Sequence, residues 1–213
     1  MKSLRSLFEM CLNAVYTHTA ESGDYAFNVE GDTLYILFEW SDGKEDWKNN
    51  FNFPVKPYKQ MDHTWLCHGG FFKVWSAMRD EIESSVLKIL EITPEIKNIV
   101  CVGYSHGAAL SVLATEDMAY LYSGEYVVTG YGFGAPRVLW GFIPKAVKHR
   151  LERFVTVRNI PDIVTHVPPR LFGFRNAGKL LRIGKTGKYT PIRAHYPEVY
   201  ITELKGENQW FPT

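Results

Sequence analysis

The sequence predicts an α/β fold with a mostly parallel central sheet, an antiparallel hairpin at its edge and helices on both faces. Short apolar runs alternate with longer segments whose apolar residues recur at helical spacing. This alternation is typical of a parallel sheet covered on both faces. Near the N-terminus, strand-like runs at 25–28 and 34–38 flank Val29-Glu30-Gly31-Asp32, which indicates a hairpin and hence a mixed edge.

The same patterns place each element in order. An amphipathic first helix is expected because apolar residues from Leu4 to Val15 recur at helical spacing. A polar stretch with several aromatic residues, from Trp40 to Trp65, is expected to form a long surface excursion. Helical spacing returns over 71–92 and is followed by a buried strand that begins at Asn98. Further strands are expected at 126–131, 153–157 and 180–183, and a further helix near 144–151.

Composition favours one domain over residues 1–213. The chain is 46% hydrophobic and 15% aromatic, without internal repeats or a linker, which is enough for one large core. Basic and acidic residues number 24 and 23, so the basic excess typical of nucleic-acid binding is missing and we expect no nucleic-acid partner.

Apolar runs and cysteines indicate the cellular compartment in which the protein is expected. No run approaches the roughly 18 apolar residues of a transmembrane helix, and the N-terminus builds no secretory apolar block. The 3 cysteines are an odd number without motif spacing, and Cys101 in an apolar run reads as a buried, inert thiol. We therefore expect a reduced, cytoplasmic protein.

A candidate nucleophile lies in Gly103-Tyr104-Ser105-His106-Gly107, which matches G-x-S-x-G. The pattern alone is weak, and a glycine turn in an unrelated fold is the alternative. Here a buried strand enters the turn and a helix leaves it, which is the context that exposes a nucleophilic serine at a strand's carboxyl end. Side chains two residues to either side would collide in so sharp a turn, and the following helix N-terminus favours developing negative charge.

A serine nucleophile needs a base and an orienting acid, in chain order serine, acid, histidine for this turn. Asp162 lies on a proline-punctuated loop after a strand, and His195 follows the last strand-like segment. His166 is an alternative base that is close enough to Asp162 for a local turn contact. His149 lies in a charged run that reads as a solvated helix face. We predict Ser105, Asp162 and His195 as the catalytic residues.

Several motifs in the same order resemble the class 3 lipases, an α/β-hydrolase family that includes fungal triacylglycerol lipases. The segments that carry the resemblance are Leu37–Ser41, Asp46-Trp47, His68–Phe71, Gly103–Ala109, Gly132–Val138, Asn159–Val164, and His195 with Tyr200. The resemblance implies an α/β-hydrolase fold, with Ser105 as nucleophile, Asp162 as acid and His195 as base. It also implies an oxyanion hole formed by Ser41 and the amide of His106.

The sequence departs from that family at three places. Glu39-Trp40 replaces the usual Arg-Gly, His106 replaces the usual Leu, and the polar segment 42–47 stands where fungal members carry an amphipathic lid. The aromatic residues of this region are expected either to line an acyl pocket or to form a satellite core under the surface excursion. They are Trp40, Trp47, Phe51, Phe53, Tyr58 and Trp65.

The predicted function is hydrolysis of small-molecule or lipid carboxylic esters by a lipase or esterase that uses an acyl-enzyme on Ser105. No metal or cofactor is expected, since no cluster of cysteine, histidine and carboxylate has ligand spacing. Two alternatives remain open. The same triad could transfer the acyl group to an acceptor other than water, or the domain could be a non-catalytic binding module with a lipase fold.

Overall fold

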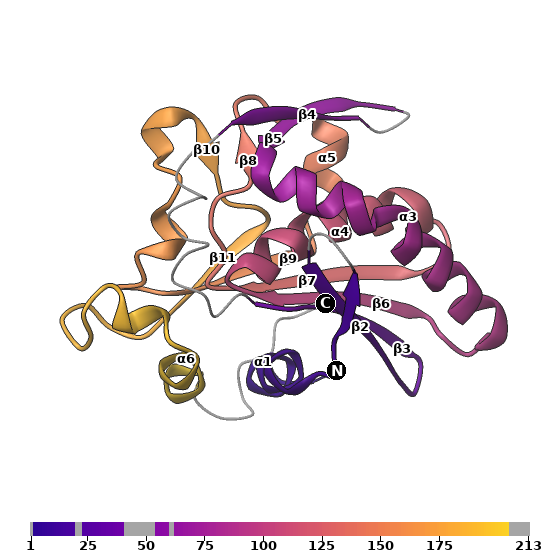
Figure 1. Ribbon diagram of the computed structural model, residues 1–213, viewed down its shortest axis with the longest axis horizontal. Coiled ribbons are helices and arrows are strands. Elements are labelled where there is room, and N and C mark those ends of the chain that lie inside the picture. The colour runs from indigo at the N-terminus through magenta and orange to yellow at the C-terminus, as the bar shows by residue number, and fades with distance from the viewer. Residues whose placement is uncertain (1, 20–22, 41–53, 60–61, 205–213) are drawn as a thin grey trace.

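The computed structural model describes residues 2–19, 23–40, 54–59 and 62–204 (Figure 1). Its largest element is a 7-stranded sheet in the order β1-β2-β3-β6-β7-β9-β11. The strands β1, β2 and β3 pair antiparallel, and every pair from β3 to β11 is parallel. The mixed sheet with a hairpin edge is therefore confirmed. The strands span Thr17–Thr19 (β1), Gly23–Glu30 (β2), Thr33–Phe38 (β3), Asn98–Tyr104 (β6), Val127–Phe133 (β7), Phe154–Asn159 (β9) and Lys179–Ile183 (β11).

The central strands are apolar on both faces. In β3, Leu34, Ile36 and Phe38 join one core, whereas Tyr35 and Leu37 join the core on the opposite face. Successive side chains of a strand point to opposite faces, so a run without polar residues requires cover on both sides. The long apolar strands therefore dictate a three-layer arrangement.

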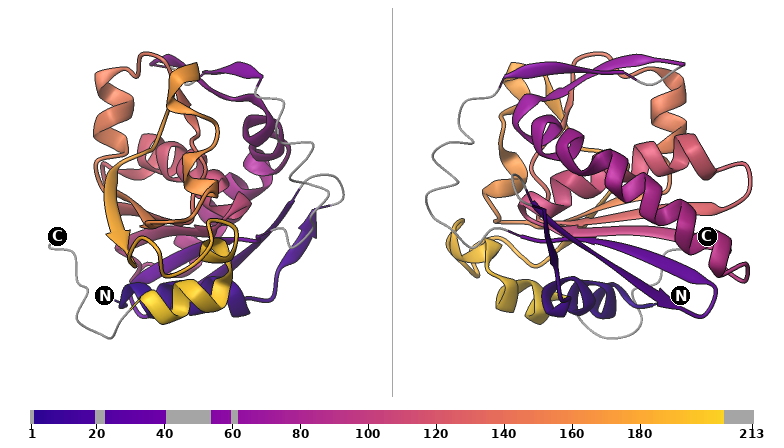
Figure 2. Two further views of the ribbon diagram at one scale, coloured as in Figure 1. Left: turned by 90° about the vertical axis from the view of Figure 1, so that its left-hand side faces the viewer. Right: turned by 45° about the vertical axis from the view of Figure 1, so that its right-hand side comes forward.

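Helices provide that cover (Figures 1 and 2). The helices α1 (Leu4–Asn13) and α6 (Pro197–Glu203) lie on one face, and α3 (Gly69–Ile92) and α4 (His106–Tyr122) lie on the other. Ser3 caps α1 by accepting from the Ser6 amide at 3.1 Å. The predicted helices at 4–15 and 71–92 are thus present. The other helical segments within the described residues are α5 (Lys145–Arg150), η1 (Val164–His166), η2 (Arg170–Phe172) and η3 (Arg193–His195).

A second sheet corrects the prediction of a surface excursion over 40–65 for residues 54–59 and 62–65, whereas residues 41–53 and 60–61 of that stretch lie outside the described residues. It has 4 antiparallel strands in the order β10-β8-β5-β4 and lies beyond α3 and α4 (Figure 1). Tyr58 of β4 and Trp65 of β5 stack at 5.0 Å and are almost fully buried. Burial of these two rings favours the hairpin, although the flanking residues are polar. The strands span Val55–Lys59 (β4), Thr64–His68 (β5), Leu139–Trp140 (β8) and Phe174–Arg175 (β10).

The cysteines Cys11, Cys67 and Cys101 are buried and form no disulfide. Burial raises the pKa of the Cys101 thiol to about 12, which keeps it protonated and unreactive at neutral pH. Within the described ranges, no helix has both the length and the hydropathy that crossing a bilayer requires.

Candidate active site

Ser105 occupies the sharp turn between β6 and α4. Its backbone has φ 54° and ψ −117°, and it is the one non-glycine residue with positive φ in the described part of the chain. Such strain persists only where the surroundings enforce it. A Cβ at Gly103 would lie 2.0 Å from the Gly107 carbonyl oxygen, and a Cβ at Gly107 would lie 2.3 Å from the Phe38 carbonyl oxygen. Both glycines are therefore required by the collisions that the sequence predicted.

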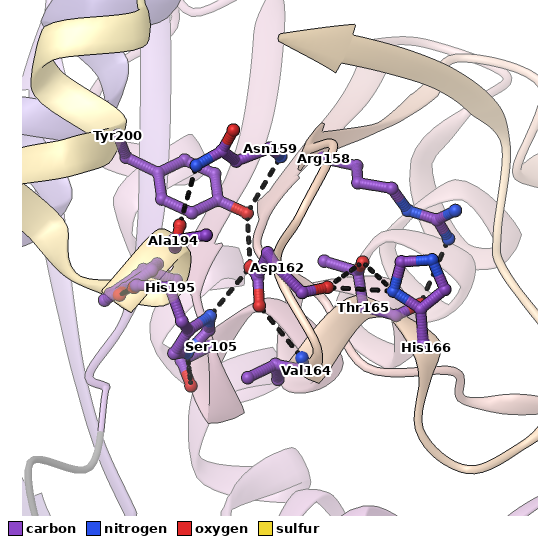
Figure 3. A network of polar contacts seen from close by, with 11 residues as sticks. Ser105, Arg158, Asn159, Asp162, Val164, Thr165, His166, Ala194, His195 and Tyr200 are labelled. Carbon is purple, nitrogen blue, oxygen red and sulfur yellow. Dashed lines mark hydrogen bonds and ion pairs between the residues drawn. The ribbon is translucent and has the colours of Figure 1, made fainter. Parts of the chain in front are cut away.

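The three predicted catalytic side chains meet at the carboxyl ends of the parallel strands (Figure 3). Ser105 Oγ lies 2.8 Å from His195 Nε2, and His195 Nδ1 lies 2.8 Å from Asp162 Oδ2. Asp162 is fully buried, and Ser105 and His195 are 5% and 8% exposed. A carboxylate, an imidazole and a hydroxyl thus form one continuous hydrogen-bonded series that is slightly exposed at Ser105 and His195 and fully buried at Asp162.

Further hydrogen bonds fix the carboxylate of Asp162. The Val164 amide donates to Oδ1 at 2.9 Å, and the Tyr200 hydroxyl donates to Oδ2 at 2.6 Å. The Tyr200 oxygen also accepts from the Asn159 amide at 3.2 Å. Burial, and then the charge of Asp162, raise the pKa of Tyr200 well above its usual value, so its hydroxyl remains a donor. Tyr200 was found from the sequence only as part of a motif.

Tyr104 holds His195 from the other side, and the sequence analysis missed this role. Its ring lies over the imidazole with centroids 5.1 Å apart and an interplanar angle of 25°. Its hydroxyl donates to the backbone carbonyl of His195. In addition, Asn159 Nδ2 donates to the Ala194 carbonyl at 2.8 Å. The only sequence signal was an aromatic residue beside the serine, because the contact spans 91 residues of chain.

Gly134 leaves room for this arrangement. It has φ 61°, and a Cβ there would lie 3.0 Å from His195 Cε1 and 3.1 Å from the Tyr200 hydroxyl. A side chain at position 134 would therefore strain the backbone and press on the candidate base. This gives a physical reason for glycine in the segment 132–138 that resembles the class 3 lipases.

The alternative histidines do not reach Ser105 by any hydrogen bond that the structure contains. His166 Nδ1 lies 2.9 Å from the backbone oxygen of Asp162 and does not bond its carboxylate, so it makes the local turn contact that the spacing suggested. His149 lies on the exposed face of α5 and pairs with Glu152 at 3.1 Å. Neither competes with His195 as partner of the serine.

Two further histidines, His106 and His68, lie around the turn. His106 is the first residue of α4, and its ring lies 5.5 Å from that of Phe71. His68 caps α3 through Nδ1, which accepts from the Gly70 amide at 3.1 Å. Burial, and then the charge of His106, lower the pKa of His68 to about 4, so His68 is neutral at neutral pH.

The structure describes only some of the predicted oxyanion and substrate-binding residues. Ser41 and Trp47 lie outside the described residues. Trp40 is half-buried, with its ring 5.5 Å from that of Tyr104. Trp40 therefore contacts the tyrosine ring that itself lies against His195. In contrast, Tyr58 and Trp65 belong to the main core around α3, and not to an acyl pocket or a separate satellite core. Phe51 and Phe53, like Trp47, lie outside the described residues.

Comparisons with known proteins relate the chain to lipases and phospholipases. The family model described as lipase (class 3) matches residues 35–172, more than half of the chain. A Rhizomucor miehei lipase is 29% identical over 155 residues, which cover 69% of this chain and 40% of the relative. An Arabidopsis thaliana phospholipase A1-IIalpha is 24% identical over 197 residues, 76% of this chain and 46% of the relative. A secreted mono- and diacylglycerol lipase from Malassezia restricta is 32% identical over 109 residues, 50% of this chain and 35% of the relative.

Solved structures show the same fold. The Rhizomucor miehei lipase in its propeptide complex has a TM-score of 0.63 at 20% identity, with 90% of this chain and 66% of that chain covered. A lipase from Rhizopus microsporus var. chinensis has a TM-score of 0.69 at 20% identity, with 89% and 71% covered. The chain spans less than half of the length of the three curated relatives named above. Because the family model matches across both the serine turn and the acid loop, this chain belongs to the class 3 lipase family.

Proposed function

We propose that this protein is a serine hydrolase of lipid carboxylic esters that acts through an acyl-enzyme on Ser105. The observation that carries the proposal is the series of two 2.8 Å contacts that joins Ser105 Oγ to His195 and His195 to the buried Asp162. The relatives support the bond type, since they are named lipase, phospholipase A1 and mono- and diacylglycerol lipase. All of these names denote hydrolases of lipid esters.

The geometry supports the following steps. His195 Nε2 removes the proton from Ser105 Oγ as the oxygen attacks the ester carbonyl carbon. Asp162, on Nδ1, fixes the imidazole tautomer and stabilises the imidazolium. The tetrahedral oxyanion then collapses, the bond to the alcohol breaks, and His195 returns its proton to the alcohol. Water, deprotonated by His195, cleaves the acyl-enzyme, releases a carboxylic acid and restores Ser105.

The oxyanion forms beside the N-terminus of α4. Because Ser105 caps this helix, the amide of His106 is its first peptide group and lies beside the reacting oxygen's position. The partial positive charge of a helix N-terminus favours an anion there. A donor of this kind contributes on the order of 10²–10³ to the rate. Because the donor is the backbone N–H, the presence of His106 in place of the family's usual Leu does not remove it.

The test is hydrolysis of p-nitrophenyl esters from acetyl to palmitoyl by wild type and by Ser105→Ala. Turnover is expected to fall by roughly 10⁶-fold in the variant. Ser111→Ala is the matched control, because Ser111 lies on the same helix and its hydroxyl bonds the Ala108 carbonyl at 2.8 Å, away from the triad. A fluorophosphonate probe should label wild type and the control and leave Ser105→Ala unlabelled.

A loss of only a few-fold in Ser105→Ala would contradict the proposal. Folded wild type without turnover and without labelling would instead indicate a binding module. Product that accumulates on an added alcohol faster than free acid appears would assign acyl transfer rather than hydrolysis. The acyl length at which turnover is highest then defines the ester class.

A further inference from the structure

A pocket of about 350 Å³ lies among β8, α5 and the start of β11. This volume is at the lower end of the range of about 300–1,000 Å³ that small-molecule sites occupy. Nothing in the proposed reaction uses its residues. They are Leu139, Ile143, Lys148, Leu151, Glu152, Arg175, Asn176, Gly178 and Lys179.

The end of the pocket formed by Leu151 and Lys179 lies far from the triad. Lys179 is the first residue of β11, and Leu151 lies three positions before β9 begins at Phe154. Asp162 and His195 follow the carboxyl ends of these same parallel strands. The 6 residues of β9 extend about 20 Å at the usual rise of about 3.3 Å each, so about one strand length separates Leu151 and Lys179 from the triad.

The floor of the pocket is apolar. Leu139, Ile143 and Leu151 are buried members of the core around α3 and α4. Beside them, Phe142 is 82% exposed, and its ring lies 5.8 Å from Lys148 Nζ. A large exposed ring that continues a buried apolar floor provides a track for a hydrocarbon chain.

The rim of the pocket is cationic. Lys148, Arg175 and Lys179 are exposed, and no carboxylate in the described part of the chain forms an ion pair with any of them. Glu152 is the one acid of the lining, and it pairs with His149 at 3.1 Å. The rim therefore favours a ligand with a negative head group.

Asn176 also lines the pocket, and its side-chain amide is held from behind by Arg158. Its Oδ1 accepts from Arg158 Nη2 at 3.0 Å, which fixes the orientation of the amide. Its Nδ2 is buried and has no hydrogen-bond partner among the described residues. Buried donors without partners are rare in folded proteins and call for an explanation.

We propose that this pocket binds a fatty carboxylate, a single-chain anionic amphiphile. The carboxylate lies among Lys148, Arg175 and Lys179, and the chain follows the apolar floor to Phe142. The proposed function would supply such a ligand, since ester hydrolysis releases a carboxylic acid. Binding itself does not involve Ser105, so the two proposals can fail separately.

The test is calorimetric titration of the full chain with dodecanoate below its micelle concentration. One site is expected in wild type. Arg175→Ala/Lys179→Ala should weaken binding by about tenfold or more, because charge-assisted hydrogen bonds are lost. Lys73→Ala/Lys88→Ala is the matched control, since it removes the same charge from exposed positions of α3 and should bind as wild type does.

Three further measurements separate this site from its alternatives. Dodecanol, which lacks the charge, should bind wild type more weakly than dodecanoate does. Its affinity should be the same for wild type and for Arg175→Ala/Lys179→Ala. Phe142→Ser, at an exposed position, should weaken dodecanoate binding without unfolding the protein. Ester hydrolysis by the double variant should equal that of wild type.

Several outcomes would overturn the proposal. They are no saturable binding, equal weakening in both double variants, or equal affinity for dodecanol and dodecanoate. Binding that survives Arg175→Ala/Lys179→Ala and disappears when Ser105 carries a phosphonate would assign dodecanoate to the triad's own cleft. Attachment to anionic vesicles without binding of free dodecanoate would assign the cations to a lipid surface instead.

Discussion

Tyr104 and His195 lie ring against ring, 5.1 Å apart and 25° from parallel, and the Tyr104 hydroxyl donates to the His195 backbone carbonyl. The residue that precedes the candidate nucleophile in sequence therefore fixes the candidate base in space. On its other flank, the Tyr104 ring contacts Phe8 of α1 at 5.2 Å. One side chain thus links the first helix of the chain to the last histidine.

Substitutions of Tyr104 should distinguish the effect of its hydroxyl hydrogen bond from that of its ring stacking on His195. Tyr104→Phe keeps the stacking and loses the hydroxyl, so we expect kcat to fall a few-fold with KM unchanged. Tyr104→Ala also loses the ring, and a displaced imidazole should lower kcat by about 10². Steady-state kinetics on a p-nitrophenyl ester measures both.

The control for Tyr104 is Tyr131→Phe, which changes a buried tyrosine of β7 in the same core layer. It should leave kcat at the wild-type value. If Tyr104→Ala lowers thermal stability while kcat of the folded fraction stays normal, Tyr104 has only a packing role.

Tyr200→Phe should leave the carboxylate of Asp162 less firmly positioned. The change removes the 2.6 Å hydrogen bond to Asp162 Oδ2 and the acceptor of the Asn159 amide. Hydrogen bonds to charged groups contribute about 1.5–3 kcal/mol. Only the part of this energy that differs between the ground state and the transition state affects turnover, so we expect kcat to fall by at most about tenfold at similar KM. Unchanged kcat with a lower melting temperature would show that the hydroxyl only stabilises the fold.

Gly107→Ala should damage both folding and turnover. The new Cβ would lie 2.3 Å from the Phe38 carbonyl oxygen and 2.5 Å from that of Glu39, and backbone atoms at these distances have to shift. Overpacking of this kind costs about 1–3 kcal/mol, and the shift moves β3 against the start of α4. Urea unfolding measures the free energy, and ester hydrolysis measures the site.

Gly124→Ala is the matched control for that change. A Cβ at Gly124 meets nothing within 4 Å, and Gly124 lies just beyond the other end of α4. Its free energy of unfolding and its kcat should stay close to the wild-type values. Equal losses in the two variants would show that the contact with Phe38 is not the cause.

His68 should make the protein less stable in acid. Its pKa is about 4 when folded and rises toward its ordinary 6.5 when unfolded, so the unfolded chain binds more protons between these values. The stability contributed by neutral His68 is complete above about pH 6.5 and is lost as the pH falls toward about 4. From about pH 7 to about pH 5 the expected loss is about 2 kcal/mol.

Urea unfolding of wild type and His68→Asn at both pH values tests this. Asparagine is a good helix cap and does not titrate, so its free energy of unfolding should change less across the interval. Parallel losses in wild type and variant would assign the acid sensitivity to other groups.

The sequence predicted elements best where one pattern is enough to form them. The helix over 71–92 and the strand at 34–38 appear as expected, because their apolar spacing matches a buried face. It failed at β4, where Val55-Lys-Pro-Tyr-Lys shows little alternation and the strand depends on Tyr58 packing against Trp65 and α3. Pairing between segments that are not themselves strongly patterned is a tertiary effect.

The sequence by itself determined the mixed α/β sheet, the sharp turn at Ser105 and the identities of Asp162 and His195 as candidates. These depend on local rules: strand and helix periodicity, glycines where side chains collide, and the chain order of a known series of groups. Only the tertiary structure decided that Tyr104 lies on His195, that Tyr200 bonds Asp162 and that Asn176 faces a cationic pocket. Such contacts join residues far apart in the chain, and their distances depend on how the layers pack, which no local pattern encodes.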